Sequence, residues 1–338
     1  MGLLIWGRRA LTFAALAGSA CIAAGFFGAA FHPFDSVSHF RLTLALALVL
    51  VALVAIPARA HLAGALAFGF AVLGLATTLP MLLPQDEATA PTGQPSYTLL
   101  QMNLLYDAGD KAEAIRRIAE TRPDVVTLEE VTDEWRALFE VISERYPFQT
   151  YCGLETDRDG VAILSRRPFL GEALCQPRHG RVTQGVDLNG RNVAVTALHL
   201  DWPWPKHHWT QIAEMSASLP AGDRPALLGG DFNAAPWSAA VRAVANAAGL
   251  RIVDGIGPTW LTIQFHAFWP RWLGLPIDQL MVSPDIMVEA VETLARTSSD
   301  HLPVLLRFSV RPSEPPPPRS AAEPTTAALR TPSPRGGA

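Results

Sequence analysis

The chain has 338 residues, of which 49% are hydrophobic and 17% are charged, and its formal net charge is −4. This length is sufficient for a domain of about 200 residues with further segments. The apolar excess argues against a wholly soluble protein. The acidic balance argues against avid nonspecific binding of nucleic acid, which normally needs a basic surface.

Three apolar runs near the N-terminus predict three transmembrane helices. They cover residues 10–31, 42–56 and 62–83. The outer two have the ~20 residues that cross a bilayer, and the shorter middle run is supported by its neighbours. A cleaved signal peptide is the alternative for the first run. Its removal would still leave two apolar runs, so three spans are favoured.

The placement of arginine predicts the membrane orientation. Arg8 and Arg9 precede the first run and Arg59 lies between the second and third, whereas Arg41 lies on the opposite side. Because basic residues favour the cytoplasmic side, we expect a cytoplasmic N-terminus. Three crossings then put everything after residue 85 outside the cytoplasm.

Composition divides the chain into four parts. We expect a membrane region at 1–84, a linker at 85–96, a globular domain at 97–310 and a Pro-rich tail at 311–338, which is predicted to be disordered. Between residues 96 and 310, two Lys and seventeen Arg face twenty-six Asp and Glu, so the domain is acidic.

Strand and helix patterns alternate irregularly through the domain. Helical spacing covers 111–120, 132–145 (with Thr132 as a candidate N-cap), 205–219 and 237–248. Strand patterns cover 97–102, 124–128, 160–164, 181–187, 192–198, 226–228, 277–283, 286–293 and 302–309. Because several strands are consecutive, the pattern favours two packed sheets with helices outside over a regular doubly wound sheet.

Three cysteines are present. Cys21 lies within the first apolar run and is interpreted as a small apolar residue. Cys152 and Cys175 flank the strand at 160–164, and in an oxidising compartment they can form a disulfide. Two unpaired buried thiols remain the alternative, because spacing alone does not fix their geometry.

Short polar motifs follow apolar runs of strand length, at points where strands are expected to end. Carboxylate, amide and imidazole groups of this kind can hold a divalent metal and cleave a phosphate ester with water. The motif residues are Asn103 in QMNL, Glu130 in TLEEV, His199 in ALHLD, Asp231 and Asn233 in GGDFN, Asp278 in PIDQL, and Asp300 and His301 in SSDHLPV.

Each motif also has a plainer structural interpretation. Gly229 and Gly230 of GGDFN permit a tight turn and close approach of the backbone, but GGDFN can equally be a plain Gly-Asp turn with a side-chain cap. Successive strand residues face opposite sides, so only one of Glu129 and Glu130 is expected to face a site, and the other to be solvated. His207 and His208 are expected at the surface. The sequence lacks P-loop, G-x-S-x-G, H-E-x-x-H and zinc-ligand patterns, which argues against those enzyme classes.

Taken in order with GVAILSR, these motifs resemble the endonuclease/exonuclease/phosphatase superfamily with the DNase I-like fold, over residues 97–309. The WPWP run after HLD and the PTW segment at 258–260 are similar to the membrane-attached bacterial branch related to the YafD proteins. The resemblance implies an α/β fold, a four-layer α/β/β/α sandwich after three transmembrane helices. It also implies a Mg²⁺- or Mn²⁺-dependent phosphoesterase in the bacterial inner (cell) membrane, with an extracytoplasmic catalytic domain.

The resemblance also implies a metal site. By motif, Glu130 is the principal metal ligand, Asn103 lies beside the metal and Asp300 lies near it. One departure concerns this group, because Glu129 stands where the family usually has Gln, and its charge would add to the site if it pointed inward.

The remaining motif residues are implied to act on the substrate. Asp231 orients or deprotonates the attacking water, and Asn233 and His199 contact the scissile phosphate. His301, held by Asp278, binds phosphate or serves as the base. The usual PIDH-like segment reads PIDQ here, but Asp278 is retained.

The substrate is expected to be a phosphodiester, cleaved in a nuclease-like reaction, and no obligate protein partner is implied. A lipid head group is an alternative, because aromatic residues favour membrane interfaces; they can equally be core or lid residues. An inactive membrane-anchored binding protein is the other alternative. The aromatic residues are Trp202, Trp204 and Trp209 in one region and Phe265, Phe268, Trp269, Trp272 and Leu273 in another.

Overall fold

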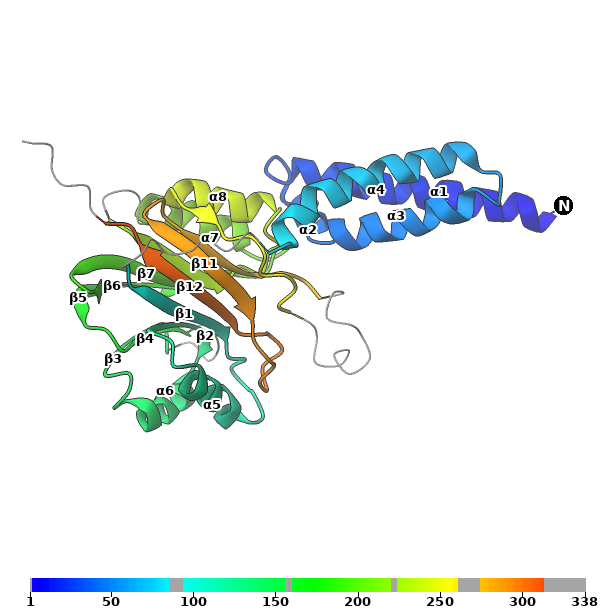
Figure 1. Cartoon of the computed structure of the whole chain (residues 1–338). Coiled ribbons are helices and arrows are strands. Elements are labelled where there is room, and N and C mark those ends of the chain that lie inside the picture. Colours follow the sequence, from blue (N-terminus) through cyan, green and yellow to red (C-terminus); the bar gives the residue numbers. More distant parts are fainter. Residues whose placement is uncertain are drawn as a thin grey trace, which may run out of the picture.

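The computed structural model describes residues 2–84, 94–155, 158, 160–219, 224–260 and 274–312 (Figure 1). Residues 85–93 of the predicted linker, the aromatic group at 265–273 and residues 313–338 of the predicted tail lie outside the described residues.

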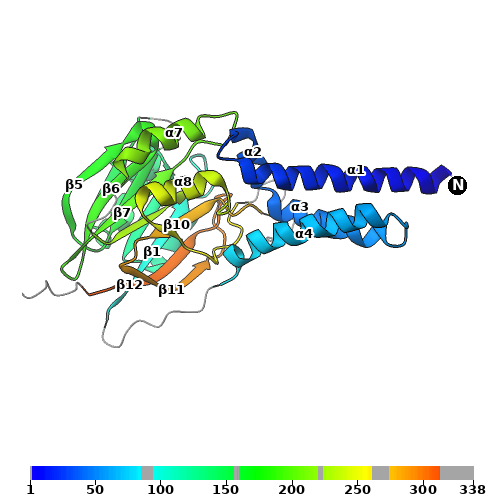
Figure 2. The same cartoon turned by 90° about the horizontal axis from the view of Figure 1, so that it is seen from above.

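A helical bundle extends from one side of a two-sheet domain (Figures 1 and 2). It contains α1 (Gly2–Ala24), α3 (Arg41–Ala55) and α4 (His61–Leu82), with a short helix, α2 (His32–Ser38), between the first two. The three long helices pack through small side chains, among them Ala15, Ala45 and Ala67. Such residues allow helix backbones to approach closely.

The bundle supports two membrane spans by length and composition. The windows Ile5–Phe27 and His61–Leu82 are long and apolar enough to cross a bilayer. A third span is obtained only if α2 and α3, which meet at an angle of 63°, are counted as one bent segment. The predicted middle span of 42–56 is therefore a 15-residue helix that needs α2 to reach membrane length.

The domain contains two six-stranded sheets. In spatial order, the first sheet is β11 (Ile286–Thr293), β12 (Val304–Val310), β1 (Ser96–Asn103), β2 (Val125–Val131), β4 (Gly160–Ser165) and β3 (Phe148–Cys152). The second sheet is β5 (Phe169–Gln176), β6 (Arg181–Leu188), β7 (Arg191–His199), β8 (Ala226–Asp231), β10 (Asp278–Val282) and β9 (Arg251–Ile252). The sequence patterns missed β3, β5 and β9, because these edge strands are half-buried, exposed or very short.

Apolar side chains form three layers of packing around these sheets. One cluster lies between the sheets. A second lies under α5 (Lys111–Thr121) and α6 (Asp133–Phe139) on the outer face of the first sheet, and a third under α7 (His208–Met215) and α8 (Ala239–Ala248) on the second. The predicted mixed α/β fold with two packed sheets and outer helices is confirmed.

Local capping explains where the helices begin. Thr132 caps α6 by accepting a hydrogen bond from the Trp135 amide, as predicted. Ser238 caps α8, so this helix starts at Ala239 rather than at 237. The predicted helix at 205–219 is shorter and covers only His208–Met215 before a 3-10 turn. Pro205 does not account for the later start, because proline is tolerated in the first turn of a helix.

The two cysteines of the domain are paired. Cys152 on β3 and Cys175 on β5 form a disulfide with a Cα–Cα distance of 5.4 Å, which is within the usual range. The bond joins an edge strand of one sheet to an edge strand of the other. Of the two possibilities left open by the sequence, the structure has the disulfide rather than two unpaired thiols.

The chain between α1 and α3 forms an elbow, residues 31–40, that packs on the N-terminal end of α8 (Figure 2). The Asp35 carboxylate accepts hydrogen bonds from the backbone amides of Ala239 (2.7 Å) and Ala240 (3.1 Å). The Trp237 indole donates to the Ser38 carbonyl at 2.7 Å. The elbow thus supplies a cap for a helix that lies two hundred residues later in the chain.

One surface prediction is wrong at this contact. His208 was expected at the surface, but its side chain is only 1% exposed. The residue opens α7, and the neighbouring Trp209 ring stacks on His32 of the elbow at 4.6 Å between centroids. Burial by the elbow could not be read from local sequence, because the covering residues lie far away in the chain.

Candidate active site

A parallel strand pair in each sheet brings the predicted residues to one end of the sandwich. In the first sheet β1 is parallel to β2, with Asn103 opposite Glu129. In the second, β7 is parallel to β8, with His199 opposite Asp231. Because parallel strands end at the same edge, polar residues that close these four strands collect at one place.

A β-bulge at Glu130 changes the direction of its side chain. Glu130 has a φ of 57°, and the pairing of β2 with β4 shifts register between Glu129 and Val131. This left-handed conformation is costly for a residue with a Cβ, and strained residues of this kind cluster at functional sites. The bulge breaks strict strand alternation, so both glutamates are buried.

The Asn103 amide joins the carboxylates of the two sheets. Its Nδ2 donates to Glu130 Oε1 at 3.2 Å and to Asp231 Oδ2 at 3.0 Å. Its Oδ1 accepts from the Leu105 amide, and the Tyr106 amide donates to Glu130 Oε2 at 3.1 Å. Asn103, predicted beside the metal, is therefore held in one orientation between two acids.

Two histidines flank Asp231. His301 Nε2 lies 3.7 Å and His199 Nε2 lies 3.8 Å from Asp231 Oδ2. On the other side of its ring, His301 Nδ1 lies 2.8 Å from Asp278 Oδ2. The contact between Asp278 and His301, which sequence alone could not establish, is present and directs Nε2 toward Asp231.

Behind these groups lies Gln101, a polar residue that the sequence motifs did not identify. Gln101 donates from Nε2 to Glu129 Oε2 and to Asp278 Oδ1, both at 2.8 Å. Glu129 is completely buried, so the expectation that it is solvated is wrong. Gln101 could have been identified from its position two residues before Asn103. Alternate residues of a strand share a face, so Gln101 is expected on the same side of β1 as Asn103.

Ser299 is another missed residue. Its hydroxyl donates to the Asn103 carbonyl at 2.8 Å and accepts from the His301 amide at 3.0 Å. It therefore ties the loop before β12 to the end of β1. Its signal was its place in SSDHLPV beside two residues already singled out.

The remaining predicted residues lie at the rim. Asp300 accepts a hydrogen bond from the Trp260 indole at 2.8 Å, so one of its oxygens is engaged there. Asn233 has a φ of 49°, and its Nδ2 donates to the Leu200 carbonyl. Its backbone amide donates to Asp231 Oδ1 at 2.8 Å, as in the side-chain-capped turn proposed as the plainer interpretation.

The two glycines of GGDFN lie in β8 rather than in a turn. Close approach, the other expectation, is confirmed at Gly230, where an added Cβ would collide with the Leu198 carbonyl of β7. The glycine therefore allows β8 to reach the position from which Asp231 projects.

Burial and charge shift the ionisation of this cluster. Burial, helped by Asp278, raises the pKa of Asp231 to about 6, although His301 and His199 favour its charged form. Burial alone lowers the pKa of His301, but the carboxylates of Asp278 and Asp231 outweigh it and raise the pKa to about 10. Burial also holds the pKa of Glu129 well above its usual value.

This donor set fits a divalent cation. Among the described residues, Asp231, Asp278 and His301 are buried and have ligand atoms within 4.8 Å of one another. The predicted ligand Glu130 is not part of this group but is joined to it through Asn103. Glu129 Oε1 is also buried without a hydrogen-bond partner among the described residues. Several carboxylates gathered in a protein interior are costly unless a cation or proton compensates them. Oxygen donors of this kind suit Mg²⁺ or Mn²⁺.

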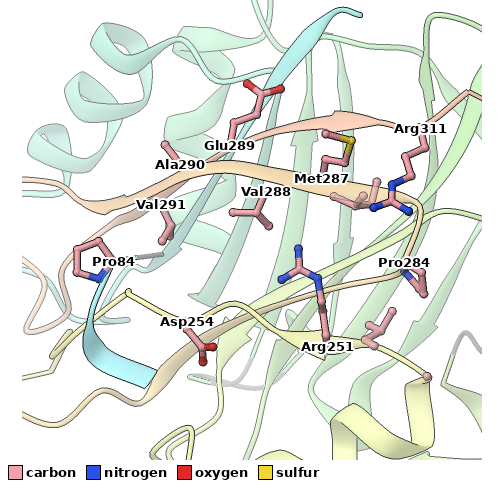
Figure 3. A pocket seen from close by; sticks show the side chains of 13 residues that line it. Pro84, Arg251, Asp254, Pro284, Met287, Val288, Glu289, Ala290, Val291 and Arg311 are labelled. Carbon is pink, nitrogen blue, oxygen red and sulfur yellow. The ribbon is translucent and has the colours of Figure 1, made fainter. Parts of the chain in front are cut away.

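A larger cavity than the one beside this cluster lies elsewhere. It has a volume of about 680 Å³ and follows β11, with Arg251 and Arg311 extending into it and Pro84 at one end (Figure 3). Its lining shares no residue with the cluster described above. A smaller pocket of about 220 Å³ includes His199 and Asn233 in its lining. The chemistry of the residues, rather than cavity size, therefore identifies the candidate site.

Comparison with known proteins is consistent with this geometry. The Endonuclease/Exonuclease/phosphatase family matches residues 100–301. No curated protein sequence matches the chain. A solved endonuclease/exonuclease/phosphatase from Beutenbergia cavernae DSM 12333 is 21% identical, with a TM-score of 0.53, and the match covers 64% of this chain and 72% of that one. One from Bacteroides vulgatus is 16% identical, with a TM-score of 0.52, and covers 64% and 100%. These two structures support the fold, and the sequence match over more than half of the chain shows that it belongs to the endonuclease/exonuclease/phosphatase family.

Proposed function

We propose that this protein is a membrane-anchored phosphodiesterase that uses a divalent cation, Mg²⁺ or Mn²⁺, to hydrolyse its substrate. The observation that carries the proposal is the buried cluster in which Asn103 joins Glu130 to Asp231, and Asp231 faces His301. These groups come from both sheets, so the fold itself assembles them. Purely structural carboxylates are rarely gathered in this way.

Each residue has a role that follows from its position. Glu130, with Asn103 beside it and Asp300 at the rim, would hold the cation, which when bound polarises the phosphoryl oxygen and water. Asp231 lies between the Asn103 amide and two imidazoles, so it is placed to orient water and receive its proton.

The other polar groups would act on the phosphoryl group. His301 is oriented by Asp278 and its pKa is raised, so its Nε2 can donate a hydrogen bond or a proton to a phosphoryl oxygen. His199 and Asn233 share the lining of the adjacent pocket and would contact the remaining phosphoryl oxygens. Preorganised donors of this kind stabilise charge that develops in the transition state.

A nuclease-like reaction on a phosphodiester is the activity proposed first, with nucleic acid and lipid head groups as the two substrate classes. We also propose an extracytoplasmic domain in the bacterial inner membrane. Arg8, Arg9 and Arg59 on one side of the spans support this orientation. A reporter fused after residue 310 tests it, and a cytoplasmic signal would contradict it.

The proposed reaction is tested with the full-length protein in detergent micelles. Hydrolysis of bis(p-nitrophenyl) phosphate is measured with Mg²⁺, with Mn²⁺ and with excess EDTA. We expect metal-dependent turnover that is lost in EDTA and in Asp231→Asn. The full chain is used because the elbow caps α8, and an isolated domain would lack that cap. A folded protein that binds the substrate without turnover would instead indicate an inactive binding protein.

A further inference from the structure

The elbow fixes the candidate site close to the helical bundle. Trp237, whose indole bonds to Ser38 of the elbow, follows Asp231 by six positions. An extended chain rises by at most about 3.6 Å per residue, so the Cα atoms of Asp231 and Trp237 lie within about 22 Å of each other. On the other side of the bundle, the Gly255 amide donates to the Met81 carbonyl near the end of α4.

The end of the sandwich that carries the site is directed toward the bundle. The arrowheads of β1 and β11 point to the side from which the long helices extend (Figure 1). Asn103 ends β1, and the loop that carries His301 follows β11. If the long helices cross a bilayer, the catalytic end of the domain therefore faces that bilayer rather than the surrounding water.

Exposed aromatic side chains connect the elbow to the rim of the site. Phe31 and Phe34 of the elbow are exposed. The Ser36 hydroxyl lies 3.5 Å from the Trp204 carbonyl, and the Trp204 side chain is 56% exposed. Trp202 lines the pocket beside the site and packs edge-on against Trp260. Aromatic residues in such a position are typical of the interfacial region of a membrane.

The pocket beside the site carries positive charge within an acidic domain. Among the described residues, Arg158, Arg178 and Lys206 line it together with one acidic residue, Asp201. Lys206 is one of only two lysines between residues 96 and 310. The pocket adjoins His199 and Asn233, so a ligand group bound there would lie next to the phosphoryl group that is cleaved.

We propose that the substrate is a phosphodiester carried by a membrane lipid, whose anionic head group enters the pocket lined by Arg158, Arg178 and Lys206 at the bilayer surface. This inference rests on the proposed phosphodiesterase function and on membrane anchoring. The aromatic rim, defined by Phe31, Phe34 and Trp204, would insert at the interface and hold the site against the lipid. A long duplex is less compatible with a site that faces the bilayer and an acidic domain.

The test uses the full-length protein in vesicles of phosphatidylethanolamine, phosphatidylglycerol and cardiolipin, with Mg²⁺. Loss of each lipid phosphodiester is followed by phosphorus NMR after extraction. The same preparation is assayed with bis(p-nitrophenyl) phosphate and with plasmid DNA. We expect lipid hydrolysis, fastest for cardiolipin, whose second phosphate can enter the basic pocket while the first is cleaved, and no appreciable nicking of the plasmid.

Two rim variants separate lipid access from chemistry. Trp204→Ala and Phe34→Ala should each reduce lipid turnover by roughly tenfold, the effect of losing one large apolar contact. Both should leave turnover of soluble bis(p-nitrophenyl) phosphate unchanged. Leu174→Ala, an exposed apolar residue on β5, is the matched control and should change neither rate.

The outcomes distinguish the two proposals. If soluble diesters or plasmid are cleaved but none of the three lipids is, the inference is overturned while the phosphodiesterase function stands. If both rim variants slow lipid and soluble substrates equally, or slow neither, the inference is also overturned. If no diester of any kind is cleaved, the proposed function itself fails.

Discussion

Two buried aspartates close to α8 have opposite surroundings. Asp35 in the elbow accepts two backbone hydrogen bonds from the first turn of the helix, so its charge is matched by aligned amide dipoles. Asp231 lies near two imidazoles and close enough to Asp278 for their charges to interact. One carboxylate is satisfied by backbone amides. The other belongs to a cluster in which Asp231, Asp278 and Glu129 share one imidazole, His301, whose pKa the charges of the two aspartates raise.

The difference separates structure from function. A satisfied buried carboxylate stabilises the fold and needs nothing from outside. A crowded cluster is held in place at a cost in stability and gains from a ligand that neutralises it. The comparison predicts that variants of the Asp231 cluster lose activity while keeping the fold, and that variants of the elbow do the reverse.

The largest expected effect is on turnover in Asp231→Asn. Loss of the carboxylate that orients water should reduce turnover of bis(p-nitrophenyl) phosphate by roughly 10³-fold, about 4 kcal/mol in the transition state. Thermal unfolding in detergent should be unchanged or shifted upward, because a buried charge is removed. If the unfolding temperature fell together with turnover, the assignment of this cluster to function would be contradicted.

The second effect is on stability in Asp35→Ala. Two buried amides of α8 lose their acceptor, so the free energy of unfolding should fall by about 2–4 kcal/mol. The matched control is Asp110→Ala, which removes the exposed cap of α5 and should cost only about 1 kcal/mol. Thermal unfolding of the full-length protein measures both, and equal shifts would show that the elbow contributes no more than an ordinary cap.

A smaller effect is expected for Glu129→Gln. Glu129 is fully buried, and a glutamine side chain still accepts the hydrogen bond from Gln101 without placing a carboxylate in the interior. Unfolding should require about 1 kcal/mol more free energy at neutral pH. Exposed Glu172→Gln on β5 is the control and should be neutral. Destabilisation by Glu129→Gln would show that the charge at this position is compensated.

The last effect is negligible at neutral pH and appears only on acidification, as a pH dependence at the elbow contact. Burial, with nearby His39 and His32, lowers the pKa of His208 from 6.5 to about 3. The unfolded chain takes up a proton below pH 6.5 while the folded protein does not, so stability falls as pH decreases from 6.5 toward 3. The slope contributed by this group reaches about 1.4 kcal/mol per pH unit.

His208→Gln should reduce that slope, and the adjacent exposed His207→Gln should leave it unchanged. The comparison requires thermal unfolding curves at several pH values between about 4 and 7. This range extends downward from the histidine pKa of the unfolded chain. An equal slope in both variants would contradict the burial of an uncharged His208 under the elbow.

Sequence predicted the parts of this site that depend on local pattern. Asn103, Glu130, His199 and Asp231 each close an apolar strand, and strand ends of parallel pairs meet at one edge. The partnership of His301 with Asp278 was expected from the family resemblance and is present in the structure.

Other features depend on contacts that local pattern does not encode. The bulge at Glu130 sets the direction of both glutamates, so the solvated position predicted for Glu129 was wrong. Asp35 lies in an apolar N-terminal region and caps a helix more than two hundred residues away. Burial of His208 follows from that same long-range contact.

The most direct test of the difference between the Asp231 cluster and the Asp35 contact is a titration of the full-length protein with Mn²⁺. Binding is monitored by electron paramagnetic resonance. We predict saturable binding that is lost in Glu130→Gln and retained in Asp35→Asn, because only the Asp231 cluster needs a cation. Binding that is absent from the wild type, or that survives equally in both variants, would contradict the account.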